Sequence, residues 1–225
     1  LDPNVVDYVI QHPEKANPGG ERRTLRVLFC VLVGFTTMSE RLEPEEVLVL
    51  LNGYFDDATS ALKARGGTLD KFMGDALMCF WNPPLREQVD HAARACLMAL
   101  DMQAIVARHS RAFAERGAGR LGCRVGIATG PCVVGFVGSQ EQQEYTAIGD
   151  TVNLASRLEG AAKVYGVSTL VAEETVAAAG GAARSREIDL VRVKGKERPG
   201  RVFELLGPND NSRDEELDAF AEGLA

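Results

Sequence analysis

Three segments of the sequence combine glycines with charged or polar residues at points where apolar runs end. They are FCVLVGFT (29–36), DKFMGD (70–75) and YTAIGDTVNLASR (145–157). Glycine lets the backbone come close to a ligand, and polar side chains at the ends of strands can reach it. One ligand could therefore meet all three segments.

The third segment places an amide and a guanidinium on one helix face. Asn153 and Arg157 lie four residues apart, so both side chains project from the same side of a helix. Such a pair suits a sugar oxygen and a phosphate, because arginine offers a rigid fork of donors to phosphate oxygens. On spacing alone, a solvent-facing pair with Arg157 bridging to Glu159 is the more frequent outcome.

Other charged residues have equally plain alternatives. Asp75 follows a glycine at an expected hairpin tip, where a carboxylate can reach a metal or simply bond the turn's own amides. Lys71 and Lys194 are either ligand contacts or solvated lysines. His91 is interpreted as a surface or hydrogen-bonded histidine, and no serine or cysteine has a neighbouring histidine in the sequence.

The elements that must position these residues follow from apolar periodicity. The pattern predicts a short helix and linker in 1–24; helices from Pro44 to the Gly66-Gly67 stop and over 86–115, 151–165 and 173–179; a hairpin of strands 68–72 and 75–81 turning at Met73-Gly74; and strands over 25–33, 121–129, 133–137, 168–171, 188–193 and 202–206. This irregular alternation predicts an α+β or mixed α/β fold with a sheet covered by helices. A doubly wound dinucleotide fold fits less well, because both common phosphate-binding glycine motifs are missing.

Composition excludes several classes of protein. The chain has 225 residues, 45% of them hydrophobic, which suits one domain with a sizeable core and excludes disorder for most of it. The net charge of −7 argues against general affinity for nucleic acid or an anionic membrane. Most of that charge belongs to the acidic tail from Pro208 onward, so the body is nearly neutral.

Cysteine usage and the lack of targeting signals point to the cytoplasm. The five cysteines sit mostly among apolar neighbours, are odd in number and form no C-x-x-C pair, which predicts reduced core thiols. No apolar run approaches the ~20 residues that span a bilayer, and no signal segment is present. Because the chain starts at Leu1 without a methionine, we expect further sequence upstream.

Five motifs in a fixed order resemble the catalytic domain of class III nucleotidyl cyclases. They are FCVLVGFT, GGTLDKFMGDALM, RVGIATGPCVVGFVG, YTAIGDTVNLASRLE and VKGK, in a match that runs from about Arg22 to Leu206. Five ordered motifs are far more specific than any single one. The resemblance divides the chain into a helix and linker from an upstream regulatory domain (1–23), a catalytic domain (24–207) and an acidic tail (208–225).

The resemblance implies a ferredoxin-like, palm-type α+β domain with a central mixed sheet covered by helices. It implies a head-to-tail homodimer with two composite sites at its interface, and an upstream sensor domain. The implied reaction, in intracellular signalling, is conversion of ATP to 3′,5′-cyclic AMP and pyrophosphate with two Mg²⁺ or Mn²⁺ ions per site. The implied location is cytoplasmic, including as the cytoplasmic domain of a membrane-anchored receptor, and nucleic acid is not an expected partner.

The resemblance also assigns a purine-selecting pair. Lys71 and Thr146 match the two residues that read the base, and a lysine with a threonine resembles the adenylate pattern rather than the guanylate one. A lysine donor suits the acceptor N1 of adenine, whereas guanine carries a donor at that position. Guanylate cyclases of the family typically have an acid where Lys71 stands.

The remaining matches concern the ribose, the phosphates and the metal ions. Asn153 matches the residue that orients the ribose, and Arg157 the one that stabilises charge on the α-phosphate. Lys194 matches the lysine that holds the terminal phosphates, and Arg124 corresponds less closely to a further phosphate-side arginine. Asp75 matches the second of the family's two metal-binding aspartates.

The sequence departs from the family pattern at the first metal position. The family pattern is F-x-D-[IL]-x-G-F-T, and Val31 stands where the aspartate is expected. Valine has no lone pair, and residues 24–39 contain no other acid. The ligands left to metal ions are Asp75 and the backbone carbonyl of Leu32, so we expect severely weakened metal binding and impaired activity.

Three explanations of Val31 remain open at this point. The chain is an engineered inactive variant, a natural degenerate domain that binds ATP without turnover, or the partner of an intact chain that supplies the metal site. Our main interpretation is an adenylate cyclase domain with impaired metal binding; its rival is a catalytically inactive nucleotide-binding regulatory module. A polymerase-like palm is disfavoured, because the sequence shows no basic, aromatic-lined groove.

Overall fold

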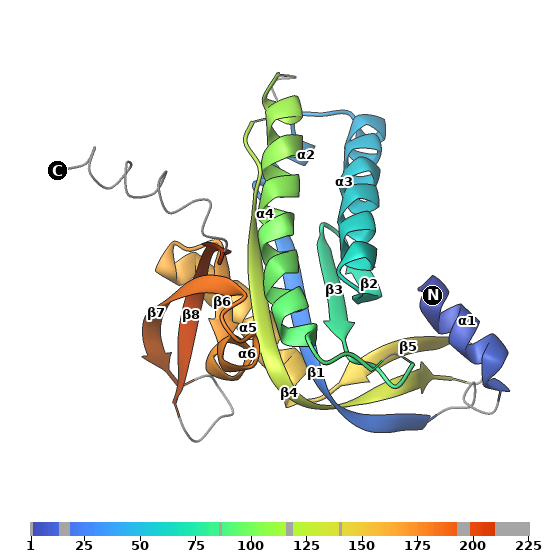
Figure 1. Cartoon of the computed structure of the whole chain (residues 1–225). Helices are drawn as coiled ribbons and strands as arrows, with labels where there is room; N and C mark the ends of the chain where they lie inside the picture. The colour runs from blue at the N-terminus through green and yellow to red at the C-terminus, as the bar shows by residue number, and fades with distance from the viewer. Residues whose placement is uncertain are drawn as a thin grey trace.

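A mixed sheet with helices on both faces forms the body of the protein (Figure 1). The computed structural model describes residues 2–13, 19–85, 87–115, 119–139, 141–192 and 199–209. Within these ranges an eight-stranded sheet has the order β2-β3-β1-β4-β6-β8-β7, and β5 pairs with β4 outside this path. The predicted α+β class with a helix-covered mixed sheet is confirmed.

The elements follow one another in an irregular order. They are α1 (Pro3–Gln11), β1 (Gly19–Val33), α2 (Phe35–Ser39), α3 (Pro44–Ala64), β2 (Thr68–Met73), β3 (Ala76–Trp81), α4 (His91–Glu115), β4 (Gly122–Gly138), β5 (Gln143–Ile148), α5 (Asp150–Tyr165), β6 (Thr169–Ala172), α6 (Glu173–Ala178), β7 (Ala183–Val191) and β8 (Gly200–Pro208). Among these helices and strands, none of the helices combines the length and apolarity needed to cross a membrane.

The two longest strands, β1 and β4, form the centre of the sheet. They pair antiparallel along their whole shared length, from Gly19 opposite Phe136 to Val33 opposite Gly122. On its other edge β1 pairs antiparallel with β3, while β4 pairs parallel with β6. The continuous apolar run from Leu25 onward therefore lies between two strands and two helical layers, as its composition predicts.

Two strand boundaries differ from the sequence prediction. Residues 19–24, expected in a linker, belong to β1, and the two strands expected around Gly130-Pro131 are one strand, β4. The cause is the same in both places: residues 19–24 pair with 131–136, so each stretch keeps the other extended. A local glycine and proline signal was outweighed by long-range pairing.

The sequence prediction also lacked two short elements and placed the start of one helix too early. The prediction contained neither the short α2 nor β5, and α4 begins at His91 rather than at residue 86. In β5 the buried Tyr145 and Ala147 alternate with more exposed neighbours, but a six-residue strand gives a weak periodic signal.

Each face of the sheet has its own apolar core. One cluster joins α3 and α4 to the sheet through residues such as Tyr54, Ala99 and Met102. The other joins α1 and α5 to the opposite face through Val5 and Leu158, among others. All five cysteines are buried and none forms a disulfide, which confirms the predicted core thiols.

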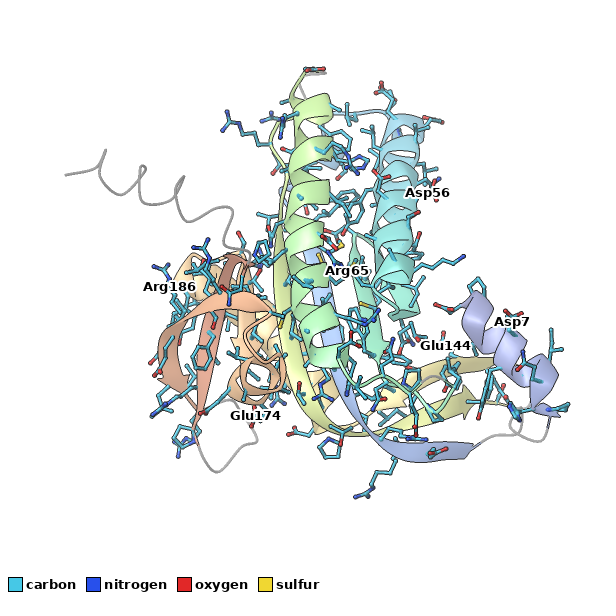
Figure 2. All side chains as sticks on the ribbon, viewed as in Figure 1. Asp7, Asp56, Arg65, Glu144, Glu174 and Arg186 are labelled. Atoms are coloured by element: carbon cyan, nitrogen blue, oxygen red, sulfur yellow. The ribbon has the colours of Figure 1, made fainter. Side chains whose placement is uncertain are left out.

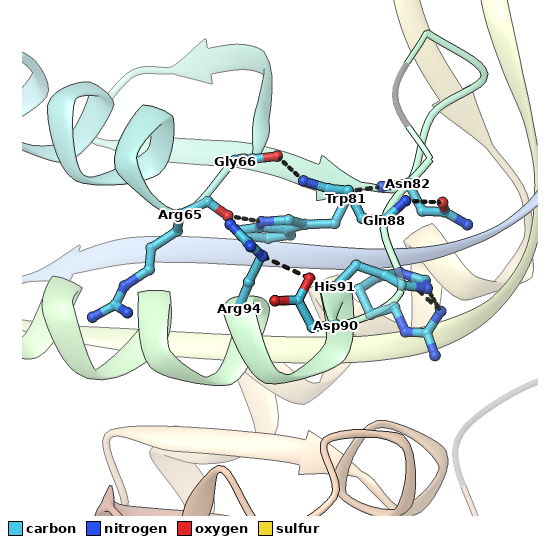
Figure 3. Close-up of polar contacts among 9 residues, drawn as sticks. Arg65, Gly66, Trp81, Asn82, Gln88, Asp90, His91 and Arg94 are labelled. Atoms are coloured by element: carbon cyan, nitrogen blue, oxygen red, sulfur yellow. Dashed lines mark hydrogen bonds and ion pairs between the residues drawn. The ribbon is translucent and has the colours of Figure 1, made fainter.

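Buried polar contacts fix the end of β3 to its neighbours (Figure 3). The indole N–H of Trp81 donates to the backbone oxygen of Arg65 over 3.0 Å, and Gln88 donates to the Gly66 oxygen over 2.9 Å. His91 is buried, with its ring Nε2 2.6 Å from Arg26 Nη1. The contact with Arg26 confirms the expectation of a hydrogen-bonded rather than a surface histidine, and burial and that guanidinium lower the His91 pKa to about 4.

Candidate active site

The hairpin of β2 and β3 positions Lys71 and Asp75. Met73 pairs with Ala76, so the turn consists of Gly74 and Asp75 rather than the predicted Met73-Gly74. Gly74 has φ +63°, a conformation that glycine adopts without strain. Asp75 therefore stands at the hairpin tip, half-buried, as the sequence predicted.

Lys71 and Thr146 come from distant parts of the chain and are brought together through Asp70. The Thr146 hydroxyl donates to Asp70 Oδ2 over 2.7 Å, and the backbone N–H of Ala147 donates to the same oxygen over 3.3 Å. Lys71 Nζ lies 3.6 Å from Asp70 Oδ1 and also pairs with Glu144. The structure thus connects β2 to β5 at the two predicted purine-selecting residues.

A break in the β2–β3 register turns Asp70 toward β5. Leu69 pairs with Cys79 and Lys71 with Met78, so Asp70 is the extra residue of a bulge. A bulge of this kind re-aims a side chain and leaves local backbone groups unpaired. The Leu69 N–H donates instead to Asp2 Oδ2 over 3.0 Å, at the start of α1.

A hollow of about 180 Å³ opens beside this bulge. Residues of α1, β2 and β5 line it, including Asp2, Val5, Asp70, Lys71 and Glu144. Figure 2 shows Glu144 on the side of the molecule that carries α1 and its Asp7. The N-terminal helix therefore contributes one wall of a hollow that is also lined by Lys71 and by Asp70, the partner of Thr146.

The charges around the hollow shift each other's ionisation. Burial raises the pKa of the Asp70 carboxyl, while its contacts with Thr146, Lys71 and Ala147 act in the opposite direction. The hydrogen bond to Glu144 raises the pKa of Lys71, so the ammonium stays charged. The hollow thus holds a positive donor next to a carboxylate that is fully shielded from water.

Asn153 and Arg157 project from α5, as their spacing predicts. Asn153 is exposed and Arg157 half-buried. The distance between α5 and β4 depends on Gly126, because a Cβ at that position would overlap the Ala155 oxygen and the Glu159 nitrogen. The helix lies against the strand at backbone contact, which fixes the place of both side chains.

Val31 lies in a row of residues across three strands. It is opposite Ala76 on β3 and opposite Arg124 on β4. Residues directly opposite one another share a sheet face, so the Val31 side chain lies on the same face as the Arg124 guanidinium. Arg124 Nε donates to Glu159 Oε1 over 2.9 Å, and burial raises the pKa of Glu159, with the nearby Asp75 charge adding to that rise.

The donors in this row do not fit two divalent ions. Mg²⁺ and Mn²⁺ prefer several oxygen ligands, and carboxylates supply most of them in proteins. Around the hairpin tip the carboxylate of Asp75 is one candidate ligand, the nearby Glu159 carboxylate is paired with Arg124, and Val31 and Ala76 offer hydrocarbon. Among the described residues no group of three or more His, Cys, Asp or Glu side chains could hold a metal ion.

One predicted site residue lies outside the described part of the chain, and three acidic residues near the site have contacts that the sequence did not predict. Lys194 and nearly all of the acidic tail lie outside the described residues. Sequence reasoning missed the contacts of Asp70 and Glu144, and it considered Glu159 as a partner of Arg157 but not of Arg124. Asp70 had a usable signal, because aspartate is depleted in strands and here precedes a strand lysine; the partners of the two glutamates depend on tertiary contacts.

Comparison with protein families matches most of this chain to one model. The model is described as "Adenylate and Guanylate cyclase catalytic domain" and matches residues 20–205. Adenylate cyclase 1 of Rhizobium meliloti is 37% identical over 186 residues, which is 83% of this chain and 28% of that protein. An adenylate cyclase of Anabaena cylindrica is 36% identical, covering 81% of this chain and 37% of that protein. The chain thus spans about a third of the length of these curated relatives.

Solved structures give the same result for the fold. The adenylyl cyclase CyaB from P. aeruginosa superposes with a TM-score of 0.77 at 34% identity, covering 87% of this chain and 98% of that one. The guanylyl cyclase Cya2 superposes with a TM-score of 0.76 at 33% identity, covering 86% and 97%. Because an adenylyl and a guanylyl cyclase match about equally, the preference for one base must be argued from individual residues.

Proposed function

Starting from the premise that this chain belongs to the adenylate and guanylate cyclase catalytic domain family, we propose that it is of the adenylate type. The proposed reaction is attack of the ribose 3′-oxygen of ATP on the α-phosphorus. The bond from that phosphorus to the pyrophosphate oxygen breaks, which gives 3′,5′-cyclic AMP and pyrophosphate. The named adenylate cyclases among its relatives support this choice.

The observation that carries the proposal is the contact of Lys71 and Thr146 with one carboxylate. Both predicted base-reading residues meet at Asp70 beside a hollow, although they are far apart in the sequence. Lys71 can only donate, which suits the acceptor N1 of adenine and opposes the N1–H of guanine. Its raised pKa keeps the donor charged.

Side chains of α5 and β4 are proposed to act on the ribose and the phosphates. Asn153 would orient the ribose, and Arg157 would stabilise the charge that develops on the α-phosphate. Arg124 is a phosphate contact in this proposal, although its ion pair with Glu159 must open or be shared for that role. Lys194 is proposed to hold the terminal phosphates.

Activity is proposed to be impaired at Val31. The family uses divalent metal ions, and the donor set of this chain lacks the carboxylate that an aspartate at residue 31 would give. No step of the reaction is therefore assigned to a metal ion here. The second candidate function, a nucleotide-binding module without turnover, is favoured by this same feature, because the proposed base-reading residues meet at Asp70 while the described residues show no cluster of three or more metal-binding side chains.

The proposed assembly is a homodimer with the active sites at its interface. In that arrangement Lys71 and Thr146 of one protomer would face Val31 and Asp75 of its partner. We also propose a catalytic domain at 24–207, preceded at 1–23 by the connection to an upstream sensor domain, and a cytoplasmic location. These proposals derive from the family resemblance rather than from contacts in a single chain.

The deciding experiment restores one carboxylate. The purified chain and Val31→Asp are incubated with ATP and Mn²⁺ or Mg²⁺, and cyclic AMP is measured. We expect Val31→Asp to be faster by about 100-fold or more, since ion-mediated charge stabilisation amounts to several kcal/mol. Val89→Asp, at a fully exposed valine, is the matched control and should not gain activity. A Val31→Asp protein that makes no cyclic AMP would contradict the proposed catalysis and leave the binding module.

A further inference from the structure

We propose that Asp70 is a positioning residue for base selection, because it binds the Thr146 hydroxyl proton and leaves the Thr146 oxygen to face the purine as an acceptor. This inference rests on the proposed function, since it takes Lys71 and Thr146 as the base-reading pair. It adds a third residue to that pair. It also gives a physical reason why threonine, which can donate or accept, would discriminate between bases.

The direction of the hydrogen bond follows from a second donor. Asp70 Oδ2 receives the backbone N–H of Ala147 over 3.3 Å, and a backbone N–H can only donate. That oxygen therefore accepts, and in the ionised carboxylate it has no proton of its own to donate. The Thr146 hydroxyl, 2.7 Å away, must then donate to it. A threonine has one hydroxyl proton, so nothing remains for it to donate to a ligand.

The resulting pair matches one purine edge and opposes the other. Adenine presents an acceptor at N1 and a donor at its 6-amino group. Lys71 is a donor and Thr146, with its proton bound to Asp70, is an acceptor, so both positions are complementary. Guanine and hypoxanthine present a donor at N1 and an acceptor at O6, so both positions are opposed. The affinity difference between two purines that follows from matched and mismatched hydrogen-bonding groups is larger than the difference that apolar contacts can give.

Burying the Asp70 carboxylate lowers the stability of the fold. A Thr146 hydroxyl without a carboxylate partner would not require that loss. The Asp70 side chain is 0% exposed, and Oδ1 is buried without a hydrogen bond among the described residues. A buried polar atom left unpaired is unfavourable. The Asp70 side chain lies in the wall of the hollow, and Asp2 accepts a hydrogen bond from the N–H of Leu69, the residue before the bulge.

The test compares ATP with inosine triphosphate, which carries the N1–H and O6 of guanine without its 2-amino group. Equilibrium dissociation constants are measured on the chain as it is, where Val31 is expected to limit turnover, and on Asp70→Ala and Asp70→Asn. In Asp70→Ala the Thr146 proton is free to donate to O6, so inosine triphosphate should bind about tenfold more tightly while ATP changes little.

The asparagine variant separates hydrogen-bond direction from a structural role. Its amide oxygen can accept from Thr146 and Ala147 as the carboxylate does, so Asp70→Asn should keep the parent preference for ATP. A purely structural defect would weaken both nucleotides together instead. Asp56→Asn, at an exposed acid on α3 outside these contacts, makes the same chemical change and is the matched control; it should leave the ratio of the two dissociation constants unchanged.

If Asp70→Ala does not fold, Thr146→Val supplies the second variant. Without the hydroxyl, adenine loses its acceptor, so the preference for ATP should fall although Asp70 is intact. The inference is overturned by a parent chain without preference for ATP, by an unchanged ratio in Asp70→Ala or Thr146→Val, or by an asparagine variant that loses the preference. Failure of the proposed catalysis is a different result, in which binding depends on Asp70 but Val31→Asp makes no cyclic AMP.

Discussion

The two halves of the candidate active site differ in how complete they are. The recognition half consists of Asp70, Lys71, Glu144 and Thr146, whose side chains are already joined by hydrogen bonds and ion pairs. The proposed metal half consists of Val31, Asp75 and the Leu32 carbonyl, and both members of its strand pair, Val31 and Ala76, are apolar. One half is organised in the free chain; the other lacks its main ligand.

At the metal half, the residues that metal binding would require are not the residues that stabilise the strand pair. A row of Val31 opposite Ala76 packs as an ordinary strand pair and brings no like charges together. Two carboxylates at the same place would repel each other unless a cation lay between them. The recognition half shows the reverse: a carboxylate is buried there with its partners in place. We therefore expect that loss of the metal half does not destabilise the fold, whereas loss of the recognition half would leave polar groups without partners.

The prediction with the largest expected effect is that the two halves of the site can be supplied by different chains. The chain as it is should complement the double variant Val31→Asp/Lys71→Ala, because each lacks a different half. Mixed at equal amounts, half of the dimers would be mixed, each with one complete site, so cyclic AMP synthesis should reach about one quarter of the Val31→Asp rate. If the mixture makes no more than the sum of its components, the two halves do not meet across a dimer interface.

A second prediction replaces the positive hydrogen-bond donor of the recognition half by a negative acceptor. In the Val31→Asp background, Lys71→Glu should shift the ratio of ATP to GTP turnover toward GTP by about 100-fold, because a carboxylate accepts the N1–H of guanine. Rates with both nucleotides at limiting concentration give the ratio. Lys163→Glu, an exposed lysine on α5, makes the same charge change elsewhere and should leave it alone. An unchanged ratio in Lys71→Glu would remove the base-reading role.

A third prediction concerns the stability of the metal half. Without metal, Val31→Asp should melt roughly 2–4 °C below the parent, since it places a third carboxylate near Asp75 and Glu159 and removes a β-branched strand residue. Added Mn²⁺ should reverse the loss in Val31→Asp and not in the parent. Val31→Asn has the same shape without the charge; if it loses as much as Val31→Asp and Mn²⁺ restores neither, repulsion is not the cause.

The smallest expected effect is a pH dependence of the recognition half. Burial raises the folded-state pKa of Asp70, so this group favours folding at low pH and that contribution is lost as pH rises through the folded pKa. Asp70→Asn cannot titrate, so its melting temperature relative to the parent should rise from pH 4 to pH 7 by roughly 2–4 °C. The His91 pKa, lowered to about 4, acts in the opposite direction in both proteins and cancels in the difference. A constant difference would contradict the burial argument.

The sequence could predict the parts of the fold that depend on local patterns. The long helices α3 and α5, the β2–β3 hairpin and the fold class followed from periodicity, glycine stops and turn residues. The pairing of residues 19–24 with 131–136 could not be predicted locally, because its stabilisation comes from a strand far away in the chain.

The candidate site could likewise be predicted only in part. Val31 lies on β1 opposite Ala76 of β3, the residue after Asp75, and the sequence related Val31 to Asp75 only through the family resemblance. The contact between Asp70 and Thr146 spans 76 residues and depends on a bulge that no periodic pattern signals. The sequence therefore identified the side chains of the pair but not the carboxylate that sets the direction of their hydrogen bonds.

Gly126 has a consequence for anyone who screens this domain genetically. Its missing side chain lets α5 lie against β4, and Asn153 and Arg157 belong to that helix. A single methyl group at residue 126 would displace α5 as a unit and so alter two proposed ligand contacts at once. The hydrogen bond between Asp70 on β2 and Thr146 on β5 involves no residue of α5 and should remain. In the Val31→Asp background, a search for loss-of-function alleles should return position 126 beside Arg157, although a hydrogen atom is all that Gly126 contributes.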